Sequence, residues 1–418
     1  MRHGVGQEKA AVTIKSEGPP SPQSPVPPKK GTRTGERVDE QKRYGVGPVK
    51  ASVTEKSEGP PDLENTVAAV LEQYPAGVYL AAVSGGADST ALLAALAAVK
   101  RRKDFALHCI HIEHGIRPAT ESRGDAAFVQ SFCKEIQVPC RVVSIAPGKI
   151  AALAKKRGIG IEAAARHYRR RAWFREAARL EAESGEAAWA ALPVRVLTAH
   201  TADDARETAL MRIFRGVGPS GLAAMPISRG RILRPLITLN RGDVLNYLNE
   251  KKIAWREDST NTGTQFLRNR IRHCLIPQLN EHFPQWRGAI AALAQTQSLA
   301  ADFIQSEAAS RVQWQSAPRS LSTSAETFFA QPPIIREEAL FQGIDRLLPS
   351  SRACKCAASR SVKRKNIRRF CVGALTAVDL GPLRLTKDLR RIIISTPVSH
   401  QESGFSLLLK APGSYNLK

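Results

Sequence analysis

Residues 84–89 read Ser-Gly-Gly-Ala-Asp-Ser and stand between an apolar run at 78–83 and a second apolar stretch at 90–99. This order predicts a strand, a tight turn and a helix. The two glycines allow the backbone to turn and to approach a ligand closely. The start of the helix offers unpaired N–H groups and the positive end of the helix dipole, and the two serines add hydroxyl groups. The stretch therefore predicts a phosphate-binding loop.

The loop differs from the common P-loop, because no lysine follows the glycines and Asp88 stands there instead. A carboxylate beside a polyphosphate is favourable when Mg²⁺ bridges the two, or when the acid transfers a proton. We therefore expect Asp88 to bind Mg²⁺ or to act as a base. The simpler alternative is an ordinary strand-to-helix turn in which Asp88 or Ser89 caps the helix.

A second glycine pattern, at residues 216–221, fits the dinucleotide-binding spacing Gly-x-Gly-x-x-Gly. That motif should follow a strand, whereas residues 207–215 have a helical pattern. We expect a loop at 216–221 and disfavour nicotinamide or flavin binding there.

The chain has 418 residues, enough for two or three domains, and a net charge of +24. This charge exceeds what solubility requires and indicates a polyanionic partner, most simply a nucleic acid. A solvated basic face or a membrane-surface contact are the alternatives. No stretch is long and apolar enough to span a membrane, so we expect a protein without membrane contact.

The seven cysteines are odd in number and contain no Cys-x-x-Cys pair. This predicts a reducing, cytoplasmic location without a disulfide framework, and two free thiols at Cys354 and Cys356. His108, His111 and His114 have a spacing that suggests a metal site. On the strand expected there, however, His111 points away from the other two, so a three-histidine metal site is disfavoured.

Residues 1–61 are rich in Pro, Gly, Ser, Lys and Glu, and the segment that begins at Gly4 returns, with changes, from Gly45. So few large apolar residues cannot offset the entropy of ordering, and we expect this duplicated segment to be disordered. It has no continuous apolar region of the kind found in secretory signals.

The rest of the chain alternates between two patterns. Strand-like apolar runs at 78–83, 106–112, 140–145 and 194–199 are separated by helical patterns at 91–100, 121–135 and 161–179. This predicts an α/β fold with a doubly wound, mostly parallel sheet, in which ligands bind at the carboxyl ends of the strands. We expect a sheet domain at 62–260, a helical domain at 261–345 and a basic segment at 346–418, whose residues 349–370 carry eight Lys or Arg and no acid.

An acidic motif follows the fourth strand. Thr201 and Asp204 have the spacing of a capping box at the start of a helix. Glu207 then lies one turn beyond Asp204, which stacks acids on one helix face at a cost in free energy. A bound cation would relieve that repulsion.

Together these segments resemble the tRNA(Ile)-lysidine synthetases, a family of the N-type ATP pyrophosphatases. The resemblance rests on 84–89, His111-x-x-His114-Gly115-x-Arg117, Glu162-x-x-Ala165-Arg166, Asp203-Asp204 with Glu207-Thr208, Arg215-Gly216-x-Gly218 with Gly221-Leu222, Arg234-Pro235-Leu236 with Arg241, Asp258-Ser259 with Asn261, and 268–272. The loop is common to all N-type pyrophosphatases, whereas the segments at 203–208 and 268–272 indicate this branch. The implied fold is an adenine nucleotide α-hydrolase-like, PP-loop sheet domain. The resemblance also implies that 62–260 is the catalytic domain and that the helical domain at 261–345 contacts tRNA.

The resemblance implies a two-step reaction on the wobble cytidine of an isoleucine tRNA. The cytosine first attacks the α-phosphate of ATP and releases pyrophosphate, and the amine of free lysine then expels AMP. The implied cofactors are ATP and Mg²⁺. The implied residues are Ser84, Gly85, Gly86, Ala87, Asp88, Ser89 and His114 for ATP, Asp88 and Arg166 for catalysis, Asp88 for Mg²⁺, Asp204 and Glu207 for lysine, and Arg268, Arg270 and Arg272 for tRNA.

Two positions depart from the family pattern, because Thr201 and Ala205 stand where a histidine and a glutamine are usual. From Arg311 onward the match is too loose to carry residues across. One alternative function is a tRNA thiolase of the same superfamily, but many of those carry paired cysteines. The other is a non-catalytic RNA-binding protein on the same scaffold, against which the intact loop and acidic motif argue.

Overall fold

The structure is a computed structural model that describes residues 62–116, 119–183, 192–257, 267–347 and 364–396. The duplicated segment at 1–61 and the Cys354–Cys356 pair lie outside these residues. So do Arg117 and the Asp258, Ser259 and Asn261 positions of the family pattern. Among the described helices, none is both long and apolar enough to cross a membrane.

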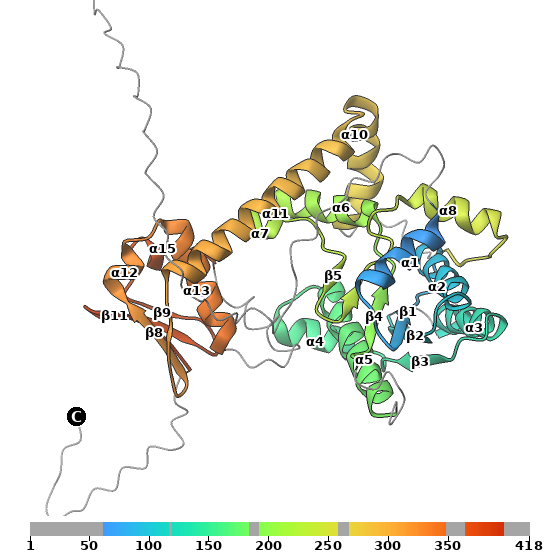
Figure 1. The fold of residues 1–418 in the computed structure, drawn as a ribbon, viewed down its shortest axis with the longest axis horizontal. Coiled ribbons are helices and arrows are strands. Elements are labelled where there is room, and N and C mark those ends of the chain that lie inside the picture. The colour runs from blue at the N-terminus through green and yellow to red at the C-terminus, as the bar shows by residue number, and fades with distance from the viewer. Residues whose placement is uncertain (1–61, 117–118, 184–191, 258–266, 348–363, 397–418) are drawn as a thin grey trace, which may run out of the picture. The chain divides into compact units, whose positions relative to one another are not determined.

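The first sheet has six strands in the order β3-β2-β1-β4-β6-β5 (Figure 1). The strands are β1 (Val78–Ala82), β2 (Ala106–Glu113), β3 (Cys140–Ser144), β4 (Arg195–Thr198), β5 (Ser228–Arg229) and β6 (Ile232–Leu233). Neighbours pair in parallel except β5, which runs antiparallel to β6. The expected parallel sheet is therefore confirmed. β5 and β6 were not predicted, because two residues are too few to show a periodic pattern.

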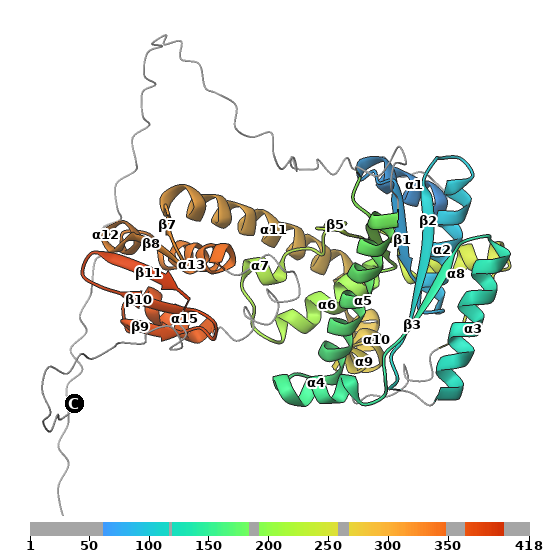
Figure 2. The same cartoon turned by 90° about the horizontal axis from the view of Figure 1, so that it is seen from below.

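Alternation along β1 shows how the sheet is buried on both faces. Tyr79 and Ala81 join a core with residues of α1 (Leu63–Gln73), α2 (Ala87–Lys100), α3 (Ala119–Glu135) and α8 (Arg241–Glu250). Val78 and Leu80 join the opposite core with α4 (Lys149–Arg157) and α5 (Ile161–Glu183). Figure 2 shows α3 and α5 on opposite sides of the strands. Such burial explains why the strands read as continuous apolar runs.

The strand order reverses beside β1. From β1 the chain moves outward through β2 to β3, and it then returns to place β4 on the other side of β1. Open α/β sheets bind their ligands at such a switch point, outside the carboxyl ends of the two strands. Residue 84 follows β1 and residue 201 follows β4, so the predicted loop and the acidic motif both begin there.

A run of helices follows the sheet. It comprises α6 (Ala202–Ile213), α7 (Pro219–Leu222), α9 (Leu267–Arg270), a π-helical turn η2 (Ile271–Leu275), α10 (Ile276–His282) and α11 (Trp286–Arg311). Leu210 of α6, Ile271 of η2 and Trp286 of α11 form one buried cluster. This cluster fixes η2 and α9 against α6.

The C-terminal part contains a second sheet, in the order β7-β8-β11-β10-β9, with antiparallel neighbours. Its elements are β7 (Gln315–Ala317), β8 (Ser320–Ser324), α12 (Ala325–Phe329), α13 (Pro333–Leu347), α15 (Arg364–Cys371), β9 (Ala377–Asp379), β10 (Arg384–Lys387) and β11 (Arg391–Ser395). The boundary expected at 345/346 falls inside α13, and two strands lie in the segment expected to be helical. β8, before the expected boundary, pairs with β11, after it. Residues before and after the boundary also share one apolar core around Phe328 and Phe370, so the two segments fold together.

Candidate active site

The loop after β1 is held by its own hydroxyl groups. Gly85 has φ of 93°, a backbone conformation that favours glycine. The Ser89 hydroxyl accepts a hydrogen bond from the Ser84 N–H at 3.1 Å and donates to the Gly86 carbonyl at 3.0 Å. Gly86 is the N-cap of α2, and no side chain caps this helix start. The alternative of an ordinary capped turn is therefore not what the structure has, and the helix N–H groups face the loop without a side-chain acceptor.

A cavity of about 630 Å³ lies at the switch point, a size typical of small-molecule sites. Its wall includes all the loop residues expected to bind ATP except Gly85, together with His114, Arg166 and Asp204. Arg166 reaches it from α5 on one face of the sheet, and Asp204 from α6 after β4. The structure thus brings the phosphate-binding loop and the acidic motif to one cavity.

Asp88 has one oxygen paired and one without a partner. Its Oδ2 accepts a hydrogen bond from Arg241 Nη1 at 3.0 Å, whereas Oδ1 is buried and has no hydrogen-bond partner within the described residues. Burial raises the pKa of Asp88 above its usual value, although the Arg241 guanidinium opposes this shift. A buried carboxylate oxygen without a donor, on a residue of the cavity wall, fits a hard cation such as Mg²⁺.

The acidic motif begins with the predicted capping box. Asp204 donates its N–H to Thr201 Oγ1 at 3.4 Å, and Asp204 Oδ2 accepts from the Thr201 N–H at 2.9 Å. The capping box is therefore confirmed at the start of α6. Because Thr201 is the N-cap, this departure from the family pattern has a clear structural role.

The stacked acids are neutralised by two arginines from α9 and η2. Arg268 reaches both acids, with Nη2 at 2.6 Å from Asp204 Oδ1 and Nε at 2.7 Å from Glu207 Oε2. Arg272 Nε lies 2.6 Å from Glu207 Oε1. The Glu207 side chain is only 3% exposed, so its charge requires these partners. The repulsion between the acids is therefore relieved by two guanidinium groups of the same chain, where a bound cation was expected.

The residues predicted to bind tRNA and those predicted to bind lysine do not all border the cavity. Arg268 and Arg272 line the cavity and bind the acids, whereas Arg270 between them is exposed. Asp204 forms part of the cavity wall, but Glu207 lies behind the two arginines and does not. Of the two acids expected to bind lysine, only Asp204 therefore borders the cavity.

Two site residues were given no role from the sequence. Arg241 binds Asp88, as described, across a large separation along the chain. His200 lies in the cavity wall with Nδ1 2.9 Å from Thr198 Oγ1, and burial lowers its pKa to about 4. His200 is therefore neutral at physiological pH. Its position directly after β4 was the one signal that could have identified it.

The second glycine pattern is not a dinucleotide site. It follows α6 rather than a strand, and Gly218 is the N-cap of the four-residue helix α7. A short helix therefore occupies part of the segment expected to be a loop.

Comparison with known proteins adds to this geometry. The family described as the PP-loop domain matches residues 61–279. The tRNA(Ile)-lysidine synthase of Treponema pallidum (strain Nichols) is 34% identical over 360 residues, which cover 80% of this chain and 72% of that protein. The chain belongs to the tRNA(Ile)-lysidine synthase family.

Other members of the lysidine synthase family match over shorter lengths. The tRNA(Ile)-lysidine synthase of Treponema denticola is 39% identical, and the match covers 50% of this chain and 43% of that protein. The one of Solibacter usitatus is 34% identical, and the match covers 73% of this chain and 60% of that protein. Among solved structures, the U34-tRNA thiolase NcsA from Methanococcus maripaludis is similar with a TM-score of 0.41 and 15% identity, over 57% of this chain and 78% of that one. The family match covers the first sheet and the helices that carry both arginines of the acidic cluster.

The raised pKa of Asp88 gives a prediction for stability. A carboxyl whose pKa is higher in the folded state than in the unfolded state destabilises the fold as the pH rises above its unfolded value. We expect Asp88→Asn to melt at the same temperature as the wild type or higher at pH 7.5, with a smaller difference at pH 4.5. Thermal denaturation followed by circular dichroism measures this. A clear loss of stability at pH 7.5 contradicts it.

Asp125→Asn is the matched control. Asp125 is also a nearly buried carboxylate of this cavity, but Arg256 Nε lies 3.1 Å from its Oδ1. Both changes leave a half-exposed guanidinium without its carboxylate, but of the two acids only Asp88 has a buried oxygen that no donor among the described residues reaches. We therefore expect Asp125→Asn to melt at a lower temperature than Asp88→Asn at pH 7.5.

Proposed function

We propose that this chain joins free lysine to C2 of the wobble cytidine of an isoleucine tRNA with a CAU anticodon. ATP is converted to AMP and pyrophosphate, and an adenylated tRNA is the intermediate. One observation supports this most: a loop suited to phosphates and an acid suited to a cationic amino acid share the wall of one cavity. Membership of the lysidine synthase family supports the same reaction.

In the first step, the O2 atom of the cytosine attacks the α-phosphorus of ATP and pyrophosphate leaves. We assign the triphosphate to the loop, where the N–H groups at the start of α2 and the hydroxyls of Ser84 and Ser89 offer donors to the departing oxygens. Arg166 and His114 are at the same wall, and we assign Arg166 to the charge that develops on the α-phosphate.

We assign Mg²⁺ to Asp88, whose buried Oδ1 has no partner among the described residues. The ion would neutralise charge on the phosphates. The protein also provides Arg241, which holds the second carboxylate oxygen of Asp88 and fixes its direction.

In the second step, the ε-amine of lysine attacks C2 and AMP leaves. With an ordinary pKa of about 10.4, this amine must first lose a proton. We assign this proton to Asp88 when its carboxylate holds no Mg²⁺, because a carboxylate with a raised pKa is a better base. Free lysine also carries an α-ammonium group, and we assign this group to Asp204 at the cavity wall.

Glu207 joins the lysine site only when a guanidinium moves. In this structure Arg268 and Arg272 already bind it, so the incoming ammonium group must compete with them. We propose that lysine displaces Arg272, whose side chain is the more exposed of the two, at 34% against 23%. Arg268 and Arg272 were expected to contact tRNA, and this arrangement assigns them first to the lysine site.

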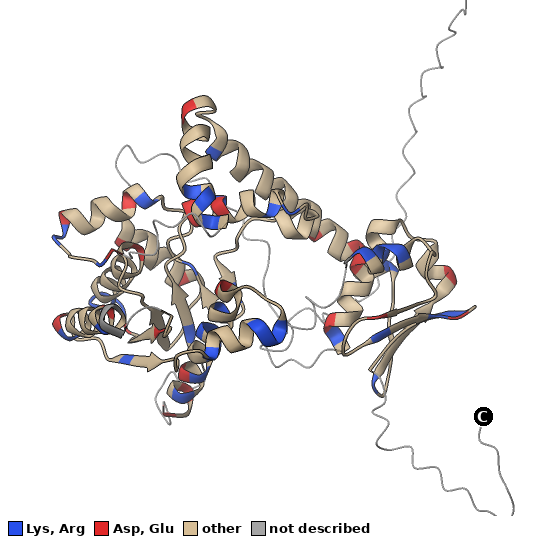
Figure 3. Ribbon diagram, turned by 180° about the vertical axis from the view of Figure 1, so that it is seen from behind, with Lys and Arg blue, Asp and Glu red and all other residues tan. Residues whose placement is uncertain are grey.

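The tRNA contact is assigned to the outward face of this region. Arg270 is exposed on α9. Figure 3 shows further Lys and Arg residues on helices of the first domain and on helices and strands of the C-terminal part. With a net charge of +24, we expect binding to depend on phosphate contacts and to weaken with salt. A reaction that uses free lysine, ATP and tRNA places the protein in the cytoplasm.

The reaction can be tested with labelled lysine. We expect label to enter a transcript of isoleucine tRNA with a CAU anticodon only when ATP is present, with AMP and pyrophosphate as products. A transcript with uridine at the wobble position is the control and should stay unlabelled. ADP and phosphate as products, or transfer of sulfur instead of lysine, contradict the proposal. Binding of tRNA without turnover favours the non-catalytic alternative.

The lysine site gives variants with opposite expected effects. Glu207→Gln removes a charge-assisted contact of about 1.5–3 kcal/mol, so the KM for lysine should rise about tenfold to a hundredfold. Arg272→Ala removes the competing guanidinium, so this KM should fall. ATP-dependent adenylation of tRNA without lysine should survive in both. Steady-state kinetics at varied lysine concentration measure the two values.

Arg270→Ala is the control for these variants, since its side chain is exposed and lies outside the cavity wall. It should change the KM for tRNA and leave that for lysine unaltered. If neither Glu207→Gln nor Arg272→Ala changes the KM for lysine, the acid–arginine cluster serves the fold alone.

A further inference from the structure

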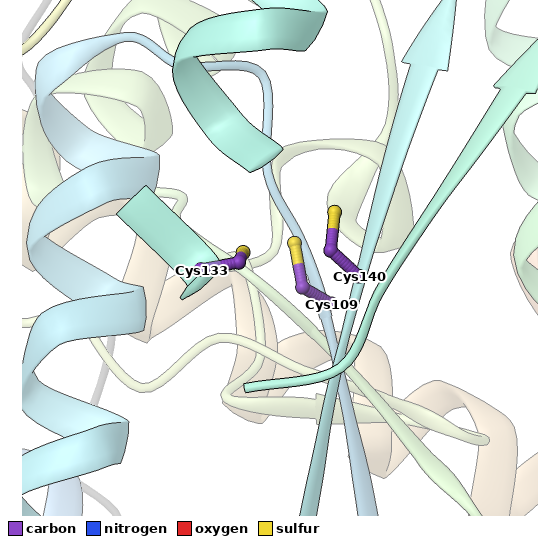
Figure 4. Close-up of side chains that lie close together, drawn as sticks. All are labelled: Cys109, Cys133 and Cys140. Atoms are coloured by element: carbon purple, nitrogen blue, oxygen red, sulfur yellow. The ribbon is translucent and has the colours of Figure 1, made fainter. Parts of the chain in front are cut away.

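Three cysteines meet beneath α3, away from the loop and the acidic motif. Cys109 comes from β2, Cys133 from the last turns of α3 and Cys140 from the first position of β3. Their sulfur atoms all lie within 4.8 Å of one another, and Figure 4 shows them between the helix and the two strands. Within the described part of the chain this is the one group of this kind.

The local backbone explains the convergence. Cys109 and Cys140 are direct partners in the parallel pairing of β2 and β3, so their side chains lie side by side. After Cys133 the chain turns back sharply, with Gln137 at φ of 54° and the Val138 N–H bonded to the Cys133 carbonyl at 2.8 Å. This is a helix ending of the Schellman type, and it returns the chain to β3 within a few residues.

The distances can be compared with what each kind of sulfur chemistry requires. A disulfide needs sulfurs about 2.05 Å apart and would leave the third thiol over. Three thiolates on one tetrahedral zinc ion, with Zn–S near 2.3 Å, lie roughly 3.8 Å apart. Sulfurs already within 4.8 Å need only small side-chain shifts to reach that spacing. A [4Fe–4S] cluster holds each cysteine on a separate iron atom, and therefore farther apart than one ion does.

We propose that Cys109, Cys133 and Cys140 form a structural zinc site. Cys109 and Cys133 are about 1% exposed, and apolar side chains such as Val129 and Val138 surround them. A divalent ion leaves a net charge of −1 on three thiolates, whereas a monovalent ion leaves −2, which is more costly to bury. Cys140 is partly exposed, so the fourth position of the ion can be taken by water on that side.

Such an ion would join β2, β3 and α3, of which β2 and α3 contact the active-site loop or the residue before it. β3 is the edge strand of the sheet, and α3 lies over the loop: a Cβ atom added at Gly85 would be 3.4 Å from Val129 Cγ2. Metal binding deprotonates the thiols and adds its free energy to folding. We therefore expect the ion to stabilise the first domain rather than to take part in the reaction.

The test uses the full-length protein, purified with reductant and without chelator, and zinc as the probe. We expect one equivalent of zinc by mass spectrometry, and one equivalent of Co²⁺ in its place with intense sulfur-to-cobalt charge-transfer absorption. Cys133→Ser and Cys140→Ser should each weaken zinc affinity by about a hundredfold. Each variant should melt at a lower temperature than the wild type when zinc is present, and at the same temperature when zinc is absent. Cys109→Ser should do the same if it folds, as judged by circular dichroism.

Two controls keep the outcome specific. Cys371→Ser changes an equally buried cysteine outside the cluster and should keep the full equivalent of zinc. The double variant Cys354→Ser/Cys356→Ser should also keep it. The proposal is overturned if zinc does not bind, if it survives in Cys133→Ser and Cys140→Ser, if only copper(I) binds, or if the intact mass shows a disulfide. Iron with visible cluster absorption overturns it as well.

Discussion

The parallel pairing of β1 with β4 is the constraint on which the site depends. Leu80 pairs with Val196 and Ala82 with Thr198, so both strands end at the same edge. Because the pairing is parallel and covered on both faces, the segments that follow must emerge together above that edge. The loop after β1 and the helix after β4 then share one cavity, although more than a hundred residues separate them along the chain.

Charge compensation decides how the acidic side of the cavity, formed by α6, is built. α6 carries three acids close together, of which Glu207 is almost fully buried. A buried, unpaired carboxylate is very costly, so the fold requires cations beside it. Arg268 and Arg272 meet that requirement from a helix packed on α6 through Leu210, Ile271 and Trp286. The position of α9 and η2 is therefore tied to the charge of α6 as well as to apolar packing.

The sequence predicted those features that depend on local pattern. The four strands from 78 to 199 were predicted because a sheet buried on both faces produces uninterrupted apolar runs. Of the helices between them, α2, α3 and α5 were predicted from their periodic patterns, whereas α4 was not. The turn at Gly85 and the capping box at Thr201 were predicted because their residue types are specific to those conformations.

Features that depend on distant partners were not predictable. The pairing of Arg268 with Glu207, and of Arg241 with Asp88, joins segments that no local pattern relates. The same holds for the cysteine cluster, whose three members come from two strands and a helix and have no Cys-x-x-Cys spacing. In the C-terminal part, β9 has three residues and β10 four, and their pairing partners are recognised only once the sheet is formed.

The π-helical turn at Ile271–Leu275 sets the rotational orientation of α10 relative to α9. Such a turn contains one residue more than a regular helical turn, and each residue of an α-helix advances the chain by about 100°. Arg272 lies inside this turn, before the phase change is complete, and Trp286 lies after it. Pro277, the second residue after this turn, has no N–H to continue a regular helix. Deleting one residue between 273 and 275 would rotate α10 by about 100° relative to the arginines. It would also move Asn280, whose side chain accepts a hydrogen bond from Trp286 Nε1 at 2.9 Å, so the direction of the charged groups and the position of Trp286 are linked through α10.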